Sequence, residues 1–214
     1  MLKIQRQKSF AEQVSDVLRA QIISGERDMG DALSETKIAK ELGVSRTPVR
    51  EAFARLELEG LVYTEPQRGT FVFTLNRCSL IDICDVRVCL ETAALRKAAE
   101  RDPAGLAATL KDIAKKMTRA RKKGDDREYL SLDTDFHQGF FDHAKNTFLN
   151  DAYQTIAAKM ACLRNKLGNH PDHMQKSYAE HLQLVDLISE SRLEEAVDVL
   201  IKHIGRKEGS YWNN

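Results

Sequence analysis

Features typical of several protein classes are absent from this sequence of 214 residues. No apolar run reaches the roughly 18 residues that a membrane-spanning helix needs, so we expect no membrane association. The first eight residues carry basic side chains but no apolar stretch or cleavage site follows them, so we expect no secretion signal and a cytoplasmic protein. The four cysteines show no C-x-x-C spacing and are interpreted as small buried side chains in a reduced protein.

The sequence also lacks the motifs of common catalytic centres. It has no H-E-x-x-H motif, no glycine-rich phosphate loop and no cysteine in a nucleophile pattern, so we expect no enzyme. The net charge of +1 neither indicates nor excludes nucleic acid. Residues 36–55, however, hold five basic side chains against two acidic ones. Such a local concentration of positive charge is sufficient for phosphate contacts, so DNA binding remains a candidate function.

The N-terminal third combines short helices with a hairpin. Apolar residues at helical spacing, with serine before and glycine after them, predict helices within residues 10–25, 34–43 and 45–60. Short apolar and β-branched runs at 61–64 and 70–73 flank a turn with proline and glycine, which predicts a hairpin. Two helices joined by a tight turn and followed by a hairpin are the parts of a winged helix-turn-helix.

The rest of the sequence shows helical signals alone. We expect about six helices within residues 79–211, and one of the predicted starts is a capping box formed by Ser191 and Glu194. The chain therefore divides into domains 1–75 and 76–214. The predicted fold class is mainly α: a winged helix-turn-helix of three helices and a β-hairpin wing, followed by an all-α helical bundle.

The segment from Leu33 to Val62, LSETKIAKELGVSRTPVREAFARLELEGLV, resembles the N-terminal domain of the GntR family of bacterial regulators. The similarity extends back into the first helix and forward through the wing at residues 67–72. Met29 stands where the family usually has a proline before Gly30, a departure that affects the rigidity of the loop rather than a contact. The resemblance implies a transcriptional regulator that binds double-stranded DNA.

The second helix of a helix-turn-helix enters the major groove with its N-terminus first, where arginines and small hydroxyls meet bases and phosphates. Arg46 and Arg50 are assigned to bases or nearby phosphates. Ser45 and Thr47 are assigned to phosphates, and Thr36 to a supporting contact. The resemblance implies the same set and adds the wing tip in the minor groove, at Arg68 and Gly69. The alternative is an ordinary helix start with solvated arginines.

Four residues of the second domain form a candidate metal site. Asp133 and His137 lie four apart on one predicted helix, so their side chains share a face. His181 and His203 lie among apolar residues on two later helices and would point into the same core. Spacing alone does not distinguish two explanations of these histidines: metal ligands, or core residues whose ring nitrogens are satisfied by hydrogen bonds.

The same residues resemble the ligand set of the FCD effector domain found in FadR-type GntR proteins, with six helices as in the shorter VanR-type group. All four positions are filled, in D-T-D-F-H at 133–137, E-H at 180–181, and the later His203. The resemblance implies a divalent metal, zinc first, with nickel, manganese or iron as alternatives. Three imidazoles and one carboxylate leave coordination positions for water or an effector carboxylate.

Arginine and amide side chains provide candidates for effector binding. Arg87 and Glu91 match the motif that opens the FCD domain, and Arg87 could donate charge-assisted hydrogen bonds to an anion. An ordinary ion pair between these two residues explains them equally well. Arg164 and Asn165 are weaker candidates. A small organic or sugar acid is the effector that the resemblance implies.

The sequence as a whole predicts a homodimeric repressor that binds a palindromic operator and responds to an effector near the metal. Two alternatives are kept. A metal site with open positions could activate water in a metal-dependent enzyme. The metal could also be purely structural, in a constitutive DNA-binding factor.

Overall fold

The computed structural model describes residues 8–168 and 170–205. Contacts within the chain divide it into two compact units, one ending at Thr74 and the other beginning at Leu75. Each unit is described by itself. No helix in the described residues is both long enough and apolar enough to span a membrane.

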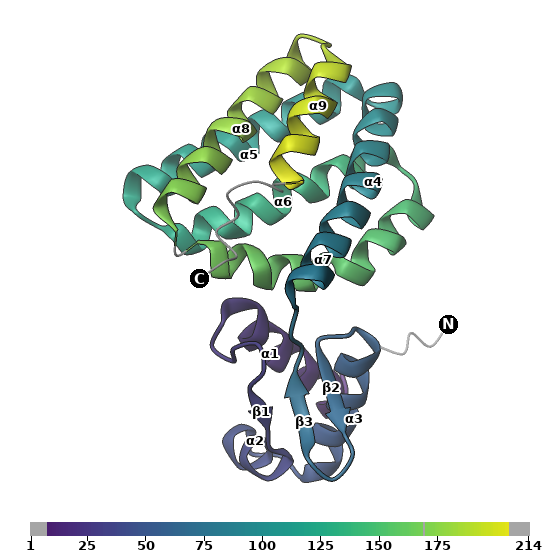
Figure 1. The fold of residues 1–214 in the computed structure, drawn as a ribbon, viewed down its shortest axis with the longest axis vertical. Helices are drawn as coiled ribbons and strands as arrows, with labels where there is room; N and C mark the ends of the chain where they lie inside the picture. The colour runs from purple at the N-terminus through teal and green to yellow at the C-terminus, as the bar shows by residue number, and fades with distance from the viewer. Residues whose placement is uncertain (1–7, 169, 206–214) are drawn as a thin grey trace, which may run out of the picture. The chain divides into compact units, whose positions relative to one another are not determined.

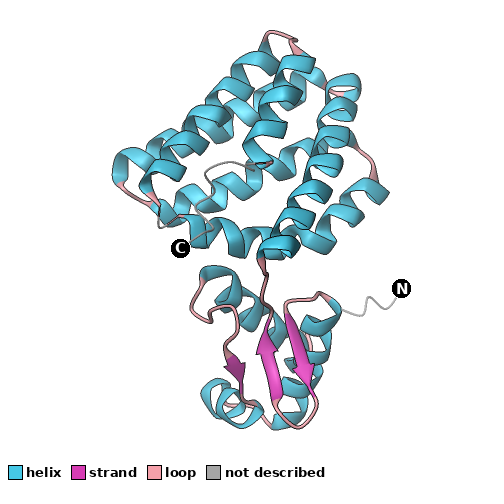
Figure 2. Cartoon of the chain, viewed as in Figure 1, coloured by secondary structure: helices cyan, strands magenta, loops and turns pink. Residues whose placement is uncertain are grey.

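The N-terminal unit contains helices and a small sheet (Figures 1 and 2). Its elements are α1 (Phe10–Ser24), β1 (Ala32–Leu33), α2 (Glu35–Leu42), α3 (Arg46–Leu58), β2 (Val62–Glu65) and β3 (Gly69–Val72). The predicted three helices and hairpin are confirmed. Strand β1 adds to the hairpin, pairing antiparallel with β3, so the strand order is β1-β3-β2. The sequence analysis missed β1 because two residues are too few to show alternation.

Local sequence explains how the helix-turn-helix is formed. Ser34 caps the start of α2 by accepting a hydrogen bond from the Lys37 amide. Gly43 ends α2 with φ of 67°, a left-handed conformation that glycine adopts without strain. Helix α3 then begins after Ser45 and packs against α1 through a face that includes Val49 and Leu56, both fully buried. The turn between α2 and α3 therefore exposes the first residues of α3.

The C-terminal unit is all-helical in its described part (Figure 2). Its helices are α4 (Arg77–Arg101), α5 (Pro103–Lys123), α6 (Asp126–Ala144), α7 (Thr147–Leu167), α8 (Pro171–Ser189) and α9 (Leu193–Ile204). Six helices agree with the expected number. Pro103 occupies the first turn of α5, where no amide hydrogen is missed, and Asp102 caps it by accepting from the Gly105 amide.

Two expectations about this unit are wrong. Ser191 does not cap α9: its φ is 59°, whereas a capping residue is normally extended, and Arg192 takes that position instead. The cysteines are not uniformly buried either. Cys162 is buried, and burial raises the pKa of its thiol to about 12, but Cys78 and Cys89 are exposed. Three cysteines on one helix of 25 residues cannot all face the core.

Helix α6 packs against α4, α5 and α7, and α9 packs against α4 and α8. Figure 1 shows these helices gathered around α6. The core between them is largely aliphatic and aromatic, with Phe136 and Phe140 fully buried. A group of polar side chains from α4, α6, α7, α8 and α9 is buried in the same unit. Since burying polar groups is unfavourable unless they are partnered, this group is the part of the unit that calls for a functional explanation.

Candidate DNA-binding surface and metal-binding cluster

The first turns of α3 present the predicted DNA contacts to solvent. Ser45 precedes the helix, but its hydroxyl makes no capping hydrogen bond. Ser45, Arg46, Thr47 and Arg50 are all exposed. Helix N-termini carry amide groups without intrahelical partners and a partial positive charge. This end of α3 therefore combines cations, hydroxyls and amides, the groups that hold phosphate oxygens and base edges.

Glu35, on α2, contacts both arginines and was not singled out by the sequence analysis. Its Oε2 accepts from Nη2 of Arg46 at 2.8 Å and from Nη2 of Arg50 at 3.0 Å. Hydrogen bonds from Arg50 and Arg46 lower the pKa of Glu35 to about 2. The three residues are 11 and 15 positions apart, so only the packing of α2 on α3 brings them together. Glu35 thus engages donors of both arginines that the sequence predicted as DNA contacts.

The remaining predicted contacts also lie on the surface of the N-terminal unit. Thr36 is exposed in the first turn of α2. Arg68 is exposed in the turn of the hairpin, where it pairs with Glu65 and lies over the ring of Phe71, 5.9 Å from its centroid. Gly69 has φ of 117°, which side chains rarely adopt, so the glycine is required by the wing.

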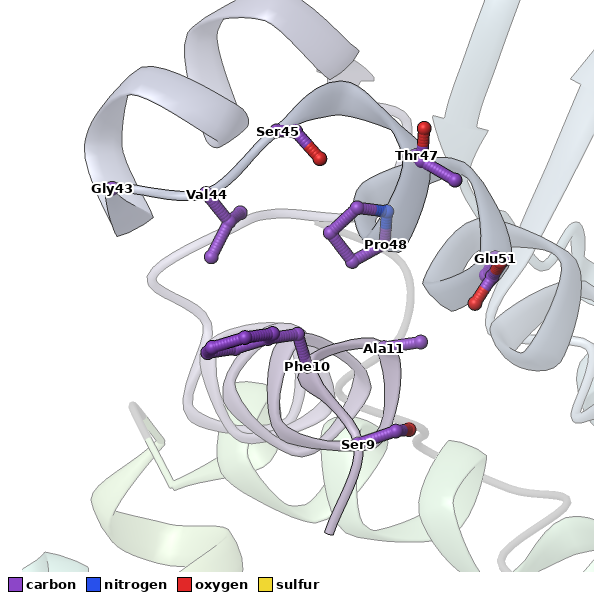
Figure 3. Close-up of a pocket in the computed structure, with 9 residues that line it drawn as sticks. All are labelled: Ser9, Phe10, Ala11, Gly43, Val44, Ser45, Thr47, Pro48 and Glu51. Carbon is purple, nitrogen blue, oxygen red and sulfur yellow. The ribbon is translucent and has the colours of Figure 1, made fainter.

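A hollow with a cavity volume of about 470 Å³ lies between the start of α1 and the turn before α3. Figure 3 shows Phe10 below Val44 and Pro48, with Ser45 and Thr47 above. Phe10 is 67% exposed. Apolar side chains and hydroxyls line the hollow, and its charged residue is Glu51.

The predicted metal ligands meet inside the C-terminal unit. Asp133 and His137 come from α6, His181 from α8 and His203 from α9, and all four residues are buried. Each offers one ligand atom, and these atoms lie within 4.8 Å of one another. Nε2 of His137 is 3.2 Å from Nε2 of His203 and 3.5 Å from Nε2 of His181. The structure thus brings together every residue of the predicted set.

Two glutamates, neither of them among the predicted metal ligands, fix the orientation of two of the histidines. Nδ1 of His137 lies 2.6 Å from Oε2 of Glu91, and Nδ1 of His203 lies 2.8 Å from Oε2 of Glu180. A carboxylate accepts hydrogen bonds, so each imidazole donates from Nδ1 and its lone pair is on Nε2. Carboxylates in this position are the usual outer partners of metal-binding histidines. The sequence analysis singled out His181 of the adjacent pair Glu180-His181 as a ligand and predicted no role for Glu180.

The surrounding charges and burial favour the protonation states of Asp133 and His137 that bind cations. Burial alone would raise the pKa of Asp133, but nearby positive charge, that of Arg164 foremost, lowers it to about 2. Burial and then the charge of Arg87 lower the pKa of His137 well below its usual value. Nε of Arg164 lies 2.8 Å from Oδ2 of Asp133, an ion pair without the alignment of a hydrogen bond. The aspartate is therefore ionised and His137 neutral.

A divalent metal fits this donor set. With both Nδ1 atoms donating to carboxylates, the Nε2 lone pairs of His137 and His203 face each other at 3.2 Å, which is unfavourable without a cation between them. Donor atoms that share one ion at about 2.0–2.1 Å are separated by roughly 3 Å, close to the spacings found here. Three imidazoles and a carboxylate suit zinc, nickel, manganese or iron.

The candidate effector residues occupy different positions around the cluster. Arg87 and Glu91 on α4 are buried and form an ion pair through Nε of Arg87. Within residues 8–168 and 170–205, the buried Nη2 of Arg87 has no hydrogen-bond partner, which is unfavourable for a cationic donor. Arg164 pairs with Asp133, and its Nη2 contacts the Tyr153 hydroxyl at 3.3 Å. Asn165 is half-buried on the same helix, and its part in effector binding stays a prediction.

Three further histidines lie outside the metal-binding cluster, and one of them, His143, makes side-chain hydrogen bonds. It lies in α6, where Nδ1 is 2.8 Å from Oδ2 of Asp102 and Nε2 is 2.9 Å from the Thr109 hydroxyl. It is thus a partly buried link between α6 and the start of α5. His170 precedes α8 and His173 lies in its first turn, both half-buried.

Comparison with known proteins assigns both units. The family model of the bacterial regulatory proteins of the GntR family matches residues 10–72, and that of the FCD domain matches residues 82–206. The latter covers more than half of the chain.

Full-length relatives agree. An HTH-type transcriptional regulator from an unstable DNA locus of Streptomyces ambofaciens is 32% identical over 191 residues, 87% of this chain and 78% of that protein. The HTH-type transcriptional repressor RspR of Escherichia coli is 25% identical over 210 residues, 94% of this chain and 92% of that protein. The structure of E. coli McbR/YncC has the same fold, with a TM-score of 0.78, 22% identity and coverage of 94% and 95%.

These relatives are regulators of transcription rather than enzymes, and the expectation that this chain is not an enzyme is confirmed. The chain belongs to the GntR family of bacterial DNA-binding transcriptional regulators and carries an FCD domain after its winged helix-turn-helix.

Proposed function

We propose that this regulator is a homodimeric repressor whose binding to a palindromic operator is controlled by a small organic or sugar acid bound near a divalent metal. The observation that carries the proposal is the buried convergence of three imidazole Nε2 atoms and the Asp133 carboxylate, beside an arginine with an unpartnered buried donor. A core that only stabilises the fold has no need for this arrangement, since burying polar groups is unfavourable and here four of them converge on one point.

The exposed end of α3 supports the DNA-binding part. Arg46 and Arg50 can exchange Glu35 for phosphates or guanine edges, because all three residues lie at a surface where ion pairs are weak. Ser45 and Thr47 can donate to phosphates beside the helix amides. A twofold dimer presents two such helices to half-sites on successive turns of the duplex, which is why a palindrome is expected.

The buried cluster supports the sensing part. Asp133, His137, His181 and His203 would hold the metal, with zinc the first candidate and nickel, manganese or iron the others. The bound metal would supply positive charge and open positions for a carboxylate oxygen. Arg87 would donate its Nη2–H to the same anion, which satisfies a donor that has no hydrogen-bond partner among the residues that the structure describes. Regulation requires the acid to bind more tightly to the state that does not bind DNA.

Selection of bound sequences from random duplex DNA, at a stated salt concentration, tests the proposal. We expect an enriched palindrome from metal-loaded protein. A panel of organic and sugar acids then competes against operator binding, and we expect at least one acid to weaken it in wild-type protein and to have less effect on Arg87→Met. Enrichment of no sequence would contradict the operator, and an affinity unchanged by every acid would contradict the sensor.

A structural role of the metal is the second candidate, because four protein ligands that are all buried could close a tetrahedral site. Chelation separates the two roles. A large drop in melting temperature, with operator binding unaffected by any acid in the metal-loaded protein, would favour the structural metal. A dependence of operator binding on an acid only when metal is present would favour the sensor.

A further inference from the structure

Glu91 touches both the candidate anion-binding arginine and a candidate metal ligand. It is fully buried on α4, and its two carboxylate oxygens have different partners. Oε1 accepts from Nε of Arg87, one turn earlier on the same helix, and Oε2 accepts from Nδ1 of His137 on α6 at 2.6 Å. With both oxygens engaged, Glu91 is poorly placed to contact an effector, the role first considered for it. It lies instead between two sites.

Glu180 is a second carboxylate that binds a ligand histidine, and comparing it with Glu91 isolates the role of Glu91. Glu180 on α8 holds Nδ1 of His203 at 2.8 Å, much as Glu91 holds His137. Both glutamates direct an Nε2 lone pair toward the other ligand atoms. Only Glu91 combines this hydrogen bond with the Arg87 ion pair described above. The two residues should therefore share an effect on metal affinity and differ in any effect that passes through Arg87.

We propose that Glu91 is a positioning residue that couples anion binding at Arg87 to the metal affinity of His137. Arg87 draws negative charge of the shared carboxylate away from the imidazole. An anion that accepts from Arg87 weakens this pull, so Glu91 becomes a stronger acceptor for Nδ1–H and Nε2 of His137 a stronger donor toward a metal. The anion and the metal then reinforce each other's binding, and the coupling is reciprocal.

The inference rests on the proposed function, since it presupposes a metal held by the four ligands. It differs from direct ligation of the acid to the metal, which would also link the two binding events. Direct ligation does not need Glu91, and it would survive replacement of Glu91 by glutamine. Coupling through Glu91 would be lost in that variant.

Zinc affinity, measured by competition with a chromophoric chelator on full-length protein, tests the proposal with acetate as the anion and chloride as its control. We expect Glu91→Gln and Glu180→Gln each to weaken zinc binding by about ten- to hundredfold. Acetate should tighten zinc binding in wild-type protein and in Glu180→Gln, but not in Glu91→Gln. Glu100→Gln, an exposed residue of α4 that pairs with Lys97, should match wild-type protein in both respects.

Absorption spectra of the cobalt-substituted proteins and melting curves of the metal-free ones accompany the titration. A positioning role predicts an altered cobalt spectrum in Glu91→Gln, which a general loss of stability does not. Should Glu91→Gln fail to fold, Arg87→Met replaces it: because Glu91 then keeps its full charge for the hydrogen bond to His137, we expect this variant to bind zinc in chloride at least as tightly as wild type, and to lose the acetate effect.

The outcomes separate the inference from the proposed function. If wild-type protein does not bind zinc or cobalt, both the metal site and the coupling are wrong. If wild-type protein binds zinc and Glu91→Gln binds it equally well, the coupling alone is overturned. An acetate effect that persists in Glu91→Gln or in Arg87→Met overturns it as well and leaves direct ligation as the link.

Discussion

Both units contain arginine–carboxylate pairs, but the surroundings of these pairs are opposite. In the N-terminal unit, Arg46 and Arg50 pair with Glu35 while their own side chains are 60% and 68% exposed. In the C-terminal unit, the side chains of Arg87 and Glu91 are 7% and 0% exposed. An exposed pair contributes little and is easily exchanged for another partner, whereas a buried pair cannot lose one member without leaving a charge in a medium of low dielectric constant.

The difference in solvent exposure suits the two kinds of pair to two kinds of binding. Surface arginines can leave Glu35 for a DNA phosphate and return, which suits reversible binding controlled by salt. Buried groups gain a ligand by completing a set of partners that is already oriented, which suits selective binding of a metal and a small anion. The predictions below test whether burial, rather than residue type, decides these behaviours.

The largest effect is expected from removing one member of a buried pair. Asp133→Ala leaves the buried Arg164 without its counterion, so we expect the metal-free protein to lose about 3–5 kcal/mol in its free energy of unfolding. Urea denaturation measures the loss. Asp135→Ala, at an exposed position on the same helix, is the control and should change this free energy by no more than about 0.5 kcal/mol. Equal losses in both variants would remove burial as the explanation.

The next effect concerns DNA. Arg50→Ala removes a cation from the exposed end of α3, and we expect its affinity for the selected operator to fall roughly tenfold or more without loss of melting temperature. Fluorescence anisotropy with labelled operator measures the affinity. Arg55→Ala is the control on the same helix, because Nη1 of Arg55 lies 3.6 Å from Oε1 of Glu12 and the residue does not pair with Glu35. It should bind operator within about twofold of wild type if the early turns of α3 make the contacts.

A smaller effect of opposite sign is expected at the carboxylate of the exposed pair. Glu35→Gln removes a negative charge that Arg46 and Arg50 must leave to reach phosphates. We expect binding to random-sequence DNA to strengthen by roughly threefold at low salt, with a steeper dependence on salt concentration. Weaker binding to random DNA would mean that Glu35 mainly positions the arginines instead of competing for them.

The smallest effect tests a half-exposed ion pair by pH. A hydrogen bond with His143 is the main cause that lowers the pKa of Asp102 below its usual 3.8. A depressed carboxylate pKa contributes stability that is present above the unfolded value and lost as pH falls through the folded value. Asp102→Asn should therefore melt slightly below wild type at neutral pH, and the gap should close below pH 3.8. A gap independent of pH would point to the lost cap of α5 alone.

The helices and their ends were well predicted because their signals are local. Ser34 and Gly43 bound α2 through capping and backbone preferences that neighbouring residues decide. Where a local signal competes with tertiary packing, the prediction fails. Glu194 lies three residues after Ser191, yet it forms an ion pair with Arg96 across to α4, and Ser191 adopts a left-handed turn instead of a cap.

The metal-binding cluster was predicted in part. Spacing on one helix joined Asp133 to His137, and the resemblance to the FCD domain added His181 and His203. Neither the spacing nor the resemblance could show that Glu91 orients the imidazole of His137 and Glu180 that of His203. Glu91 and His137 are 46 positions apart, and the hydrogen bond between them depends on how α4 packs on α6. Glu35 was missed in the DNA-binding unit for the same reason.

The amino-acid sequence by itself determined the helix boundaries that local caps decide, the hairpin, the winged helix-turn-helix motif and the types of residue available for DNA and for a metal. Each of these depends on capping, periodicity or composition within a few turns of the chain. Only the tertiary structure decided which arginines share Glu35, which nitrogen of His137 faces the other ligands, and that Arg87 retains an unpartnered donor. Those properties depend on the removal of water and on distances between helices, and neither is encoded by neighbouring residues alone.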